Sequence, residues 1–221
     1  EKGEEGSFSM IYTYTSKRPY KKNNWMPNNG WGFRSMIDIS NEDLYGDFTY
    51  QRTTVDTYSN CKLGMGTLYV RGKGIYLNGN PPAQEYVGLS DDEPIYLFGK
   101  TDGFTENINL RGSSGFRLGN CMAMSTVEYR ISLMETLPVN IFGISLGNVS
   151  GALISDIGNA WYTEQDMEDW IITAGAELKL GLRIGDMPLF YYSIGYAQTL
   201  DNWMDENEPE LYIQCSLINP F

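Results

Sequence analysis

The chain has 221 residues, enough for one sizeable domain with a core of its own. Its 28 acidic and 16 basic residues give a formal net charge of -12, which excludes a general nucleic-acid binder, because such proteins need a basic face. The sequence has no histidine, and Cys61, Cys121 and Cys215 lack zinc-binding spacing, so we expect neither a metal nor another cofactor.

Apolar and polar residues alternate along most of the chain, which indicates β-strands. In 30–40, for example, Trp31 and Phe33 share one face. Turn-forming residues at 41–43 and 59–60 separate early strands. The nine expected strands are 7–16, 30–40, 45–58, 61–77, 119–133, 139–158, 170–184, 189–200 and 211–221.

The segment 170–184 has the sharpest pattern. One face is apolar throughout, and Glu177, Lys179 and Arg183 share the other. A helix would scatter these three charges around its circumference, whereas a strand places them together. As a strand the segment spans about 50 Å. A tilted strand needs only ~9–11 residues to cross a bilayer, so we expect this strand to protrude from the membrane. We interpret the charged face as the watery interior of a barrel, and a selectivity lining is the alternative.

Long and short connections alternate in the second half of the chain. Outer-membrane barrels have short periplasmic turns and long external loops, whereas a soluble β-sandwich does not require this asymmetry. We therefore predict an all-β fold, an antiparallel transmembrane β-barrel. The connections are 78–118 (long), 134–138 (short), 159–169 (long), 185–188 (short) and 201–210 (long).

No set of catalytic residues emerges from the sequence. The carboxylates lie mostly in acidic loops, where solvated charge is the ordinary finding. There is no Gly-x-Ser-x-Gly nucleophile motif. Gly112-Ser113-Ser114-Gly115 lacks the Lys-Ser/Thr ending of a phosphate-binding loop. We therefore expect that the protein is not an enzyme.

Three motifs occur in the order and spacing of one known family. Leu110-Arg111-Gly112 resembles the Val/Leu-Arg-Gly-aromatic motif of a long external loop, with Ser113 at the aromatic position. Glu128-Tyr129-Arg130 resembles the Glu-x-Arg segment of the next strand, and Ser155-Asp156-Ile157-Gly158 resembles the Asp-x-Gly motif that follows. With the closing strands, they resemble the C-terminal half of the barrel in the outer-membrane assembly and translocation superfamily, which includes BamA, TamA and FhaC (bacterial surface antigens).

The resemblance implies that 1–221 is the C-terminal part of an outer-membrane β-barrel domain, holding about nine of sixteen strands. It implies that 78–118 is a long extracellular loop folding into the lumen. There Arg111 would pair with Asp156, with Glu128 as a second acceptor, because an arginine in a narrow lumen needs carboxylates. Asp156→Ala should then cost about 3–5 kcal/mol. Leu110 and Gly112 would belong to the loop motif, Gly158 to the strand motif, and Gln214 and Phe221 to a C-terminal assembly signal.

The function implied by the resemblance is insertion of outer-membrane proteins or polypeptide translocation. The expected location is the outer membrane of a Gram-negative type of bacterium. Expected partners are outer-membrane lipids, client outer-membrane or secreted polypeptides and accessory lipoproteins, with no nucleic acid. The alternatives left open are a passive pore, an anchor that displays an upstream soluble domain, a soluble β-sandwich binding module and, as the weakest, an enzyme.

Overall fold

The computed structural model describes residues 6–16, 29–44, 46–89, 110–113, 117–134, 140–141, 144–164, 170–184, 190–200 and 210–217. These residues form an all-β fold, in which nine strands make one antiparallel sheet in the order β1-β2-β3-β4-β7-β9-β10-β11-β12. Their bounds are Ser7–Thr15, Gly30–Ser40, Thr49–Leu63, Gly66–Asn80, Cys121–Met134, Ile144–Trp161, Ile171–Ile184, Phe190–Thr199 and Glu210–Leu217.

Smaller elements accompany this sheet. The two-residue strand β8 (Asn140–Ile141) pairs with β9, and β5 (Val87–Leu89) pairs with β6 (Arg117–Gly119) in a sheet of their own. Two short 3₁₀ helices span Glu42–Leu44 and Ala83–Glu85. Among the described residues, no helix has the length and apolarity to cross a membrane.

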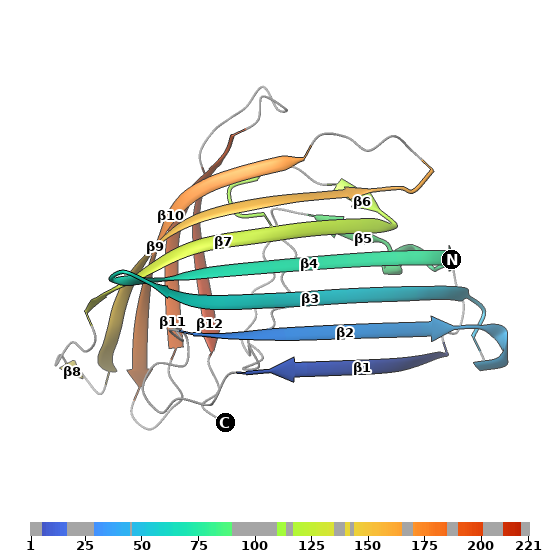
Figure 1. Cartoon of the computed structure of the whole chain (residues 1–221), viewed down its shortest axis with the longest axis horizontal. Coiled ribbons are helices and arrows are strands. Elements are labelled where there is room, and N and C mark those ends of the chain that lie inside the picture. Colours follow the sequence, from blue (N-terminus) through green and yellow to red (C-terminus); the bar gives the residue numbers. More distant parts are fainter. Residues whose placement is uncertain are drawn as a thin grey trace.

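The large sheet curls. Strands β1 to β4 run side by side, and the sheet then turns through β9 and β10, so that β11 and β12 run steeply across the first strands (Figure 1). We call the face that β5 and residues 110–113 lie against the inner face. There Val87, Leu89 and Leu110 form an apolar cluster with side chains of β4, β7, β9 and β10, among them Met122 and Ile171.

Nine antiparallel strands were expected from the sequence, and this is confirmed. The predicted faces hold as well. On β7, Glu128 is buried on the inner face while its neighbour Val127 is exposed on the outer face. On β10, Glu177 is buried and Leu178 is exposed in the same way. The alternation therefore follows from a sheet whose two faces differ in environment.

The predicted turn at 59–60 is wrong. Strand β3 continues to Leu63, and the chain turns at Gly64-Met65. Ser59 and Asn60 instead pair with residues of β4, so cross-strand pairing outweighs their local turn preference. Gly64 has a φ of 59°, a left-handed conformation that a glycine adopts at little cost.

Other boundaries also shift. Strand β9 runs on to Trp161, past the predicted end at 158, because that end pairs with the start of β7. The predicted connection 78–118 contains β5 and the first two residues of β6.

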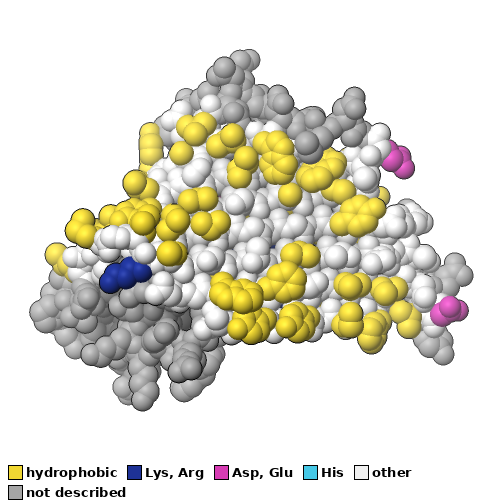
Figure 2. All heavy atoms as spheres, viewed as in Figure 1, with side chains coloured by type: hydrophobic (Ala, Val, Ile, Leu, Met, Phe, Trp, Pro, Cys, Tyr) yellow, Lys and Arg dark blue, Asp and Glu magenta, His cyan; other side chains and the backbone are white. Residues whose placement is uncertain are grey.

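The two faces of the sheet are reversed relative to a soluble β-sandwich. Buried charged residues occupy the inner face, among them Asp56, Arg71, Glu128, Asp156 and Glu177. Large apolar side chains are exposed on the outer face, and Figure 2 shows them over most strands of the sheet, with few charged side chains. The exposed apolar residues of the outer face include Phe8, Met10, Tyr12, Trp31, Ile39, Val127, Leu133, Leu153, Leu178, Ile194, Tyr196, Leu211 and Ile213.

Candidate functional site

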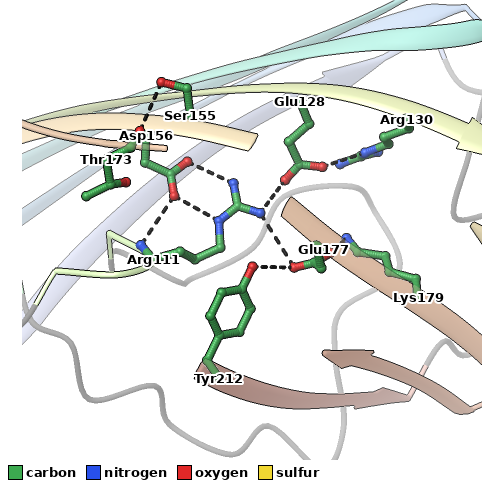
Figure 3. Close-up of polar contacts among 9 residues, drawn as sticks. All are labelled: Arg111, Glu128, Arg130, Ser155, Asp156, Thr173, Glu177, Lys179 and Tyr212. Atoms are coloured by element: carbon green, nitrogen blue, oxygen red, sulfur yellow. Dashed lines mark hydrogen bonds and ion pairs between the residues drawn. The ribbon is translucent and has the colours of Figure 1, made fainter. Parts of the chain in front are cut away.

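The site is a group of buried charges where residues 110–113 meet the inner face. The Arg111 guanidinium donates from Nε to Asp156 Oδ2 and from Nη2 to Asp156 Oδ1, both at 2.8 Å. Its Nη1 donates to Glu128 Oε1 at 2.8 Å and lies 3.7 Å from Glu177 Oε2. Figure 3 shows Arg111 between these three carboxylates, which come from β9, β7 and β10. We call Arg111, Glu128, Asp156 and Glu177 the loop cluster.

The loop cluster is closed to solvent. The Arg111 side chain is 10% exposed, and those of Glu128, Asp156 and Glu177 are 5%, 1% and 0% exposed. Burial by itself lowers the pKa of the Arg111 guanidinium, but Glu128 and Asp156 more than offset this and raise that pKa well above its ordinary value. Arg111 is therefore a permanent cation held by bidentate bonding, the strongest geometry available to an arginine.

The backbone of the loop motif packs closely against the strands of the inner face. The Arg111 backbone N–H also donates to Asp156 Oδ2, at 3.3 Å. Gly112 has a φ of 75°, and a Cβ at this position would overlap Ala197 of β11. The Thr199 hydroxyl donates to the Gly112 carbonyl at 3.0 Å. Only a glycine combines this conformation with so close an approach to the wall.

Leu110 joins the loop motif to the strand motif. Its side chain is 2% exposed and belongs to the apolar cluster under β5. A Cβ at Gly158 would lie 3.0 Å from Leu110 Cδ2. The absence of a side chain at Gly158 thus leaves the space that Leu110 occupies, and the two motifs are complementary in shape.

Further side chains extend the loop cluster. Arg130 Nε donates to Glu128 Oε2 at 2.6 Å, and its guanidinium lies 4.0 Å from the centre of the Tyr69 ring. Lys179 Nζ lies 2.7 Å from Glu177 Oε1, and the Tyr212 hydroxyl donates to Glu177 Oε2 at 2.9 Å. The carboxylates of Glu128 and Glu177 therefore each contact more than one donor, as buried charges require.

A second buried ion pair lies on the first half of the sheet. Arg71 of β4 donates from Nε and Nη2 to the two carboxylate oxygens of Asp56 on β3, at 3.0 and 2.6 Å. Both side chains are less than one-tenth exposed. We call Asp56 and Arg71 the wall pair, because both residues belong to strands of the sheet. Nothing in the sequence singled it out except alternation in the two strands.

Both sites are built from ion pairs between arginines and carboxylates. Their carboxylates are engaged by cations, an arrangement suited to holding a segment in place. Within the described ranges, no group of three or more Cys, Asp or Glu side chains is placed to hold a metal ion. The contacts of Arg111 with Glu128, Asp156 and Glu177 can fix the position of residues 110–113 against three strands.

The structure brings together Arg111, Asp156 and Glu128 as the resemblance implied, and it brings Leu110 against Gly158. Gln214 lies on β12, where it pairs with Ser193, and Phe221 lies outside the described residues. Sequence reasoning interpreted Glu177 and Lys179 only as part of a charged lining. It did not connect Glu177 with the loop, and it missed Tyr212. The available signal was the position of Glu177 on the polar face of β10.

No protein-family model matches the sequence, and a comparison with curated proteins also found no match.

Proposed function

We propose that the chain forms part of an outer-membrane β-barrel of the assembly and translocation type, and that it acts in the insertion of outer-membrane proteins or the translocation of polypeptides. The observation that carries the proposal is the loop arginine bound to carboxylates on the inner face of an inside-out sheet.

The distribution of side chains supports a lipid environment. Removing apolar surface from water is favourable by about 25 cal/mol per Å². An outer face rich in exposed Leu, Ile and Tyr is therefore unfavourable in water and favourable in a bilayer. Polar residues that point to the interior and apolar residues that point outward are typical of membrane barrels. A soluble β-sandwich has the opposite distribution.

The loop cluster supports a barrel whose interior holds a fixed segment. Arg111 contacts three strands, so residues 110–113 cannot leave the inner face without separating a bidentate ion pair. A segment held in this way narrows the interior. This favours guided handling of a polypeptide over a wide passive pore.

The last strand supports insertion of client strands. Among the described residues β12 pairs with β11 along one side only. Its outward residues Leu211 and Ile213 are each 70% exposed. A strand edge with free backbone groups and an apolar outer side is a template for an incoming strand that follows the same alternation.

The test is reconstitution of the full chain into liposomes, followed by addition of an unfolded outer-membrane β-barrel client. We expect the chain to require detergent or lipid to remain in solution and to accelerate folding of the client, measured as heat-modifiable mobility on gels. Ion conductance without any acceleration of client folding would favour the passive pore and contradict the proposed activity. A chain that remains monomeric in buffer without detergent would contradict the membrane assignment itself.

A further inference from the structure

Tyr212 bridges two strands on the inner face. It lies on β12, and its register partner on β11 is Gly195, which in turn pairs with Glu177 on β10. A Cβ at Gly195 would overlap the Tyr212 ring, so the ring lies across this glycine. The ring packs against Ala152, Ile154 and Ala197, and its hydroxyl reaches Glu177. The last strand is thereby joined to a strand that it does not pair with.

Glu177 is shared between the last strand and the loop. Its Oε2 accepts from the Tyr212 hydroxyl at 2.9 Å and lies 3.7 Å from Arg111 Nη1. Figure 3 shows Tyr212 on the side of Glu177 and Arg111 opposite Glu128. The Tyr212 ring thus covers part of a cluster whose strength depends on the exclusion of water.

We infer that Tyr212 couples the last strand to the loop, so that release of β12 from the sheet loosens residues 110–113 and release of those residues loosens β12. When the ring withdraws, water reaches Glu177 and Arg111 and weakens their ion pairs. When Arg111 withdraws, Glu177 loses a cation, and water reaches the Glu177 carboxylate that the Tyr212 hydroxyl contacts. Such coupling is reciprocal by thermodynamic necessity. It does not depend on the proposed function, because it concerns only contacts between the sheet and residues 110–113.

The opposite end of the sheet supplies a matched control. Tyr58 of β3 lies across Gly32 of β2, and its hydroxyl is 2.8 Å from Thr15 Oγ1 on the other terminal strand of the order, β1. As with Tyr212, a tyrosine ring lies across a glycine of the neighbouring strand, and its hydroxyl contacts a residue of the next strand. Tyr58 lies on β3, near the opposite end of the strand order from β12, so we expect its loss to loosen β1 without affecting the loop.

The experiment measures both ends of the coupling in the folded full chain. Trypsin cleaves after Arg111 only when this side chain leaves its site, and hydrogen exchange reports opening of β12 and β1. In Tyr212→Ala we expect faster exchange in β12 and cleavage after Arg111 accelerated on the order of 5-fold or more, the usual lower end of coupling between sites. Tyr58→Ala should accelerate exchange in β1 and leave cleavage after Arg111 at the parent rate.

The reverse direction uses Asp156→Asn, which loosens Arg111 and leaves Tyr212 in place. We expect faster exchange in β12 and unchanged exchange in β1. Tyr212→Phe, which keeps the ring and removes the hydroxyl, should lie between the parent and Tyr212→Ala, and it serves if the alanine variant does not fold. Cleavage after Arg111 at the parent rate in both Tyr212 variants, or β12 exchange at the parent rate in Asp156→Asn, would overturn the inference.

Discussion

Within the part of the chain that the structure describes, two buried arginine–carboxylate sites on the inner face differ in what they join. The wall pair connects Asp56 and Arg71 on neighbouring strands, 15 residues apart in the chain. In the loop cluster Arg111 reaches Asp156, 45 residues away, and no strand ladder brings the two together. The chemistry is the same bidentate contact in both. The consequences differ, because only the second site holds a segment that lies outside the large sheet.

This difference shows how one interaction serves two purposes. Asp56 and Arg71 are diagonal neighbours in the β3–β4 register, so pairing of the two strands already brings them close. Arg111 must instead be held against the entropy of a long connection. We therefore expect loss of the wall pair to weaken one hairpin, and loss of the loop cluster to free the loop. The following substitutions separate these effects, in order of decreasing size.

The largest effect is expected for Arg111→Met. The variant leaves Asp156, 1% exposed, without its bidentate cation, and breaking a buried ion pair in this way costs about 3–5 kcal/mol. The measurement is the free energy of unfolding by denaturant titration in detergent. Arg52→Met is the control, since the Arg52–Glu85 pair is about one-quarter exposed and should contribute less than about 1 kcal/mol. Equal losses in the two variants would contradict the role of the loop cluster.

Asp156→Ala should have a smaller effect, near 3 kcal/mol, at the lower end of the range for a broken buried pair. Arg111 keeps its 2.8 Å contact with Glu128 in this variant, so its charge is still compensated in part. Cleavage by trypsin after Arg111 should nevertheless increase. If heat-modifiability and protection of the loop both stayed at the wild-type level, the loop would be held by something other than this ion pair.

Asp56→Asn tests the other side of the comparison. It keeps the shape of the side chain but removes the charge that accepts two bonds from Arg71, and we expect a loss of about 2 kcal/mol, as for hydrogen bonds to charged groups. Hydrogen exchange should increase in β3 and β4. Cleavage after Arg111 should not change, and an increase there would show that the two sites are not independent.

The smallest effect is expected for Thr199→Val. This substitution removes the hydroxyl that donates to the Gly112 carbonyl and keeps a similar shape, so about 1 kcal/mol should be lost. We expect a slight increase in the rate of cleavage after Arg111, smaller than in Asp156→Ala. A larger increase than in Asp156→Ala would mean that the backbone contact, not the ion pair, holds the loop.

Much of the fold was predictable because each strand has two different environments. The alternation in 170–184 and 30–40 is a local signal, and it assigned both faces of β10 and β2. The turn at Gly64-Met65 was not found, since Ser59-Asn60 has the stronger turn composition, and only pairing with β4 keeps these residues in a strand. Local composition cannot report a partner strand.

The residues of the candidate site were likewise predictable only in part. Arg111, Glu128 and Asp156 were found through a resemblance in motifs, not from a physical pattern in the chain. Glu177 and Tyr212 meet only because Gly195 lies between them in the register of three strands. Register is a property of the assembled sheet, so no reading of β10 or β12 alone could have connected these two residues.

Arg130 on β7 extends the loop cluster toward β4. Its guanidinium donates to Glu128 and lies over the ring of Tyr69 on β4. With Lys179 it completes a set of four carboxylates (Asp56, Glu128, Asp156 and Glu177) and four cations (Arg71, Arg111, Arg130 and Lys179), whose formal charges sum to zero. The net charge of -12 thus lies entirely outside this set. Added salt, which screens exposed charges far more than buried ones, should change the repulsion among the remaining acidic residues and leave the buried set nearly untouched.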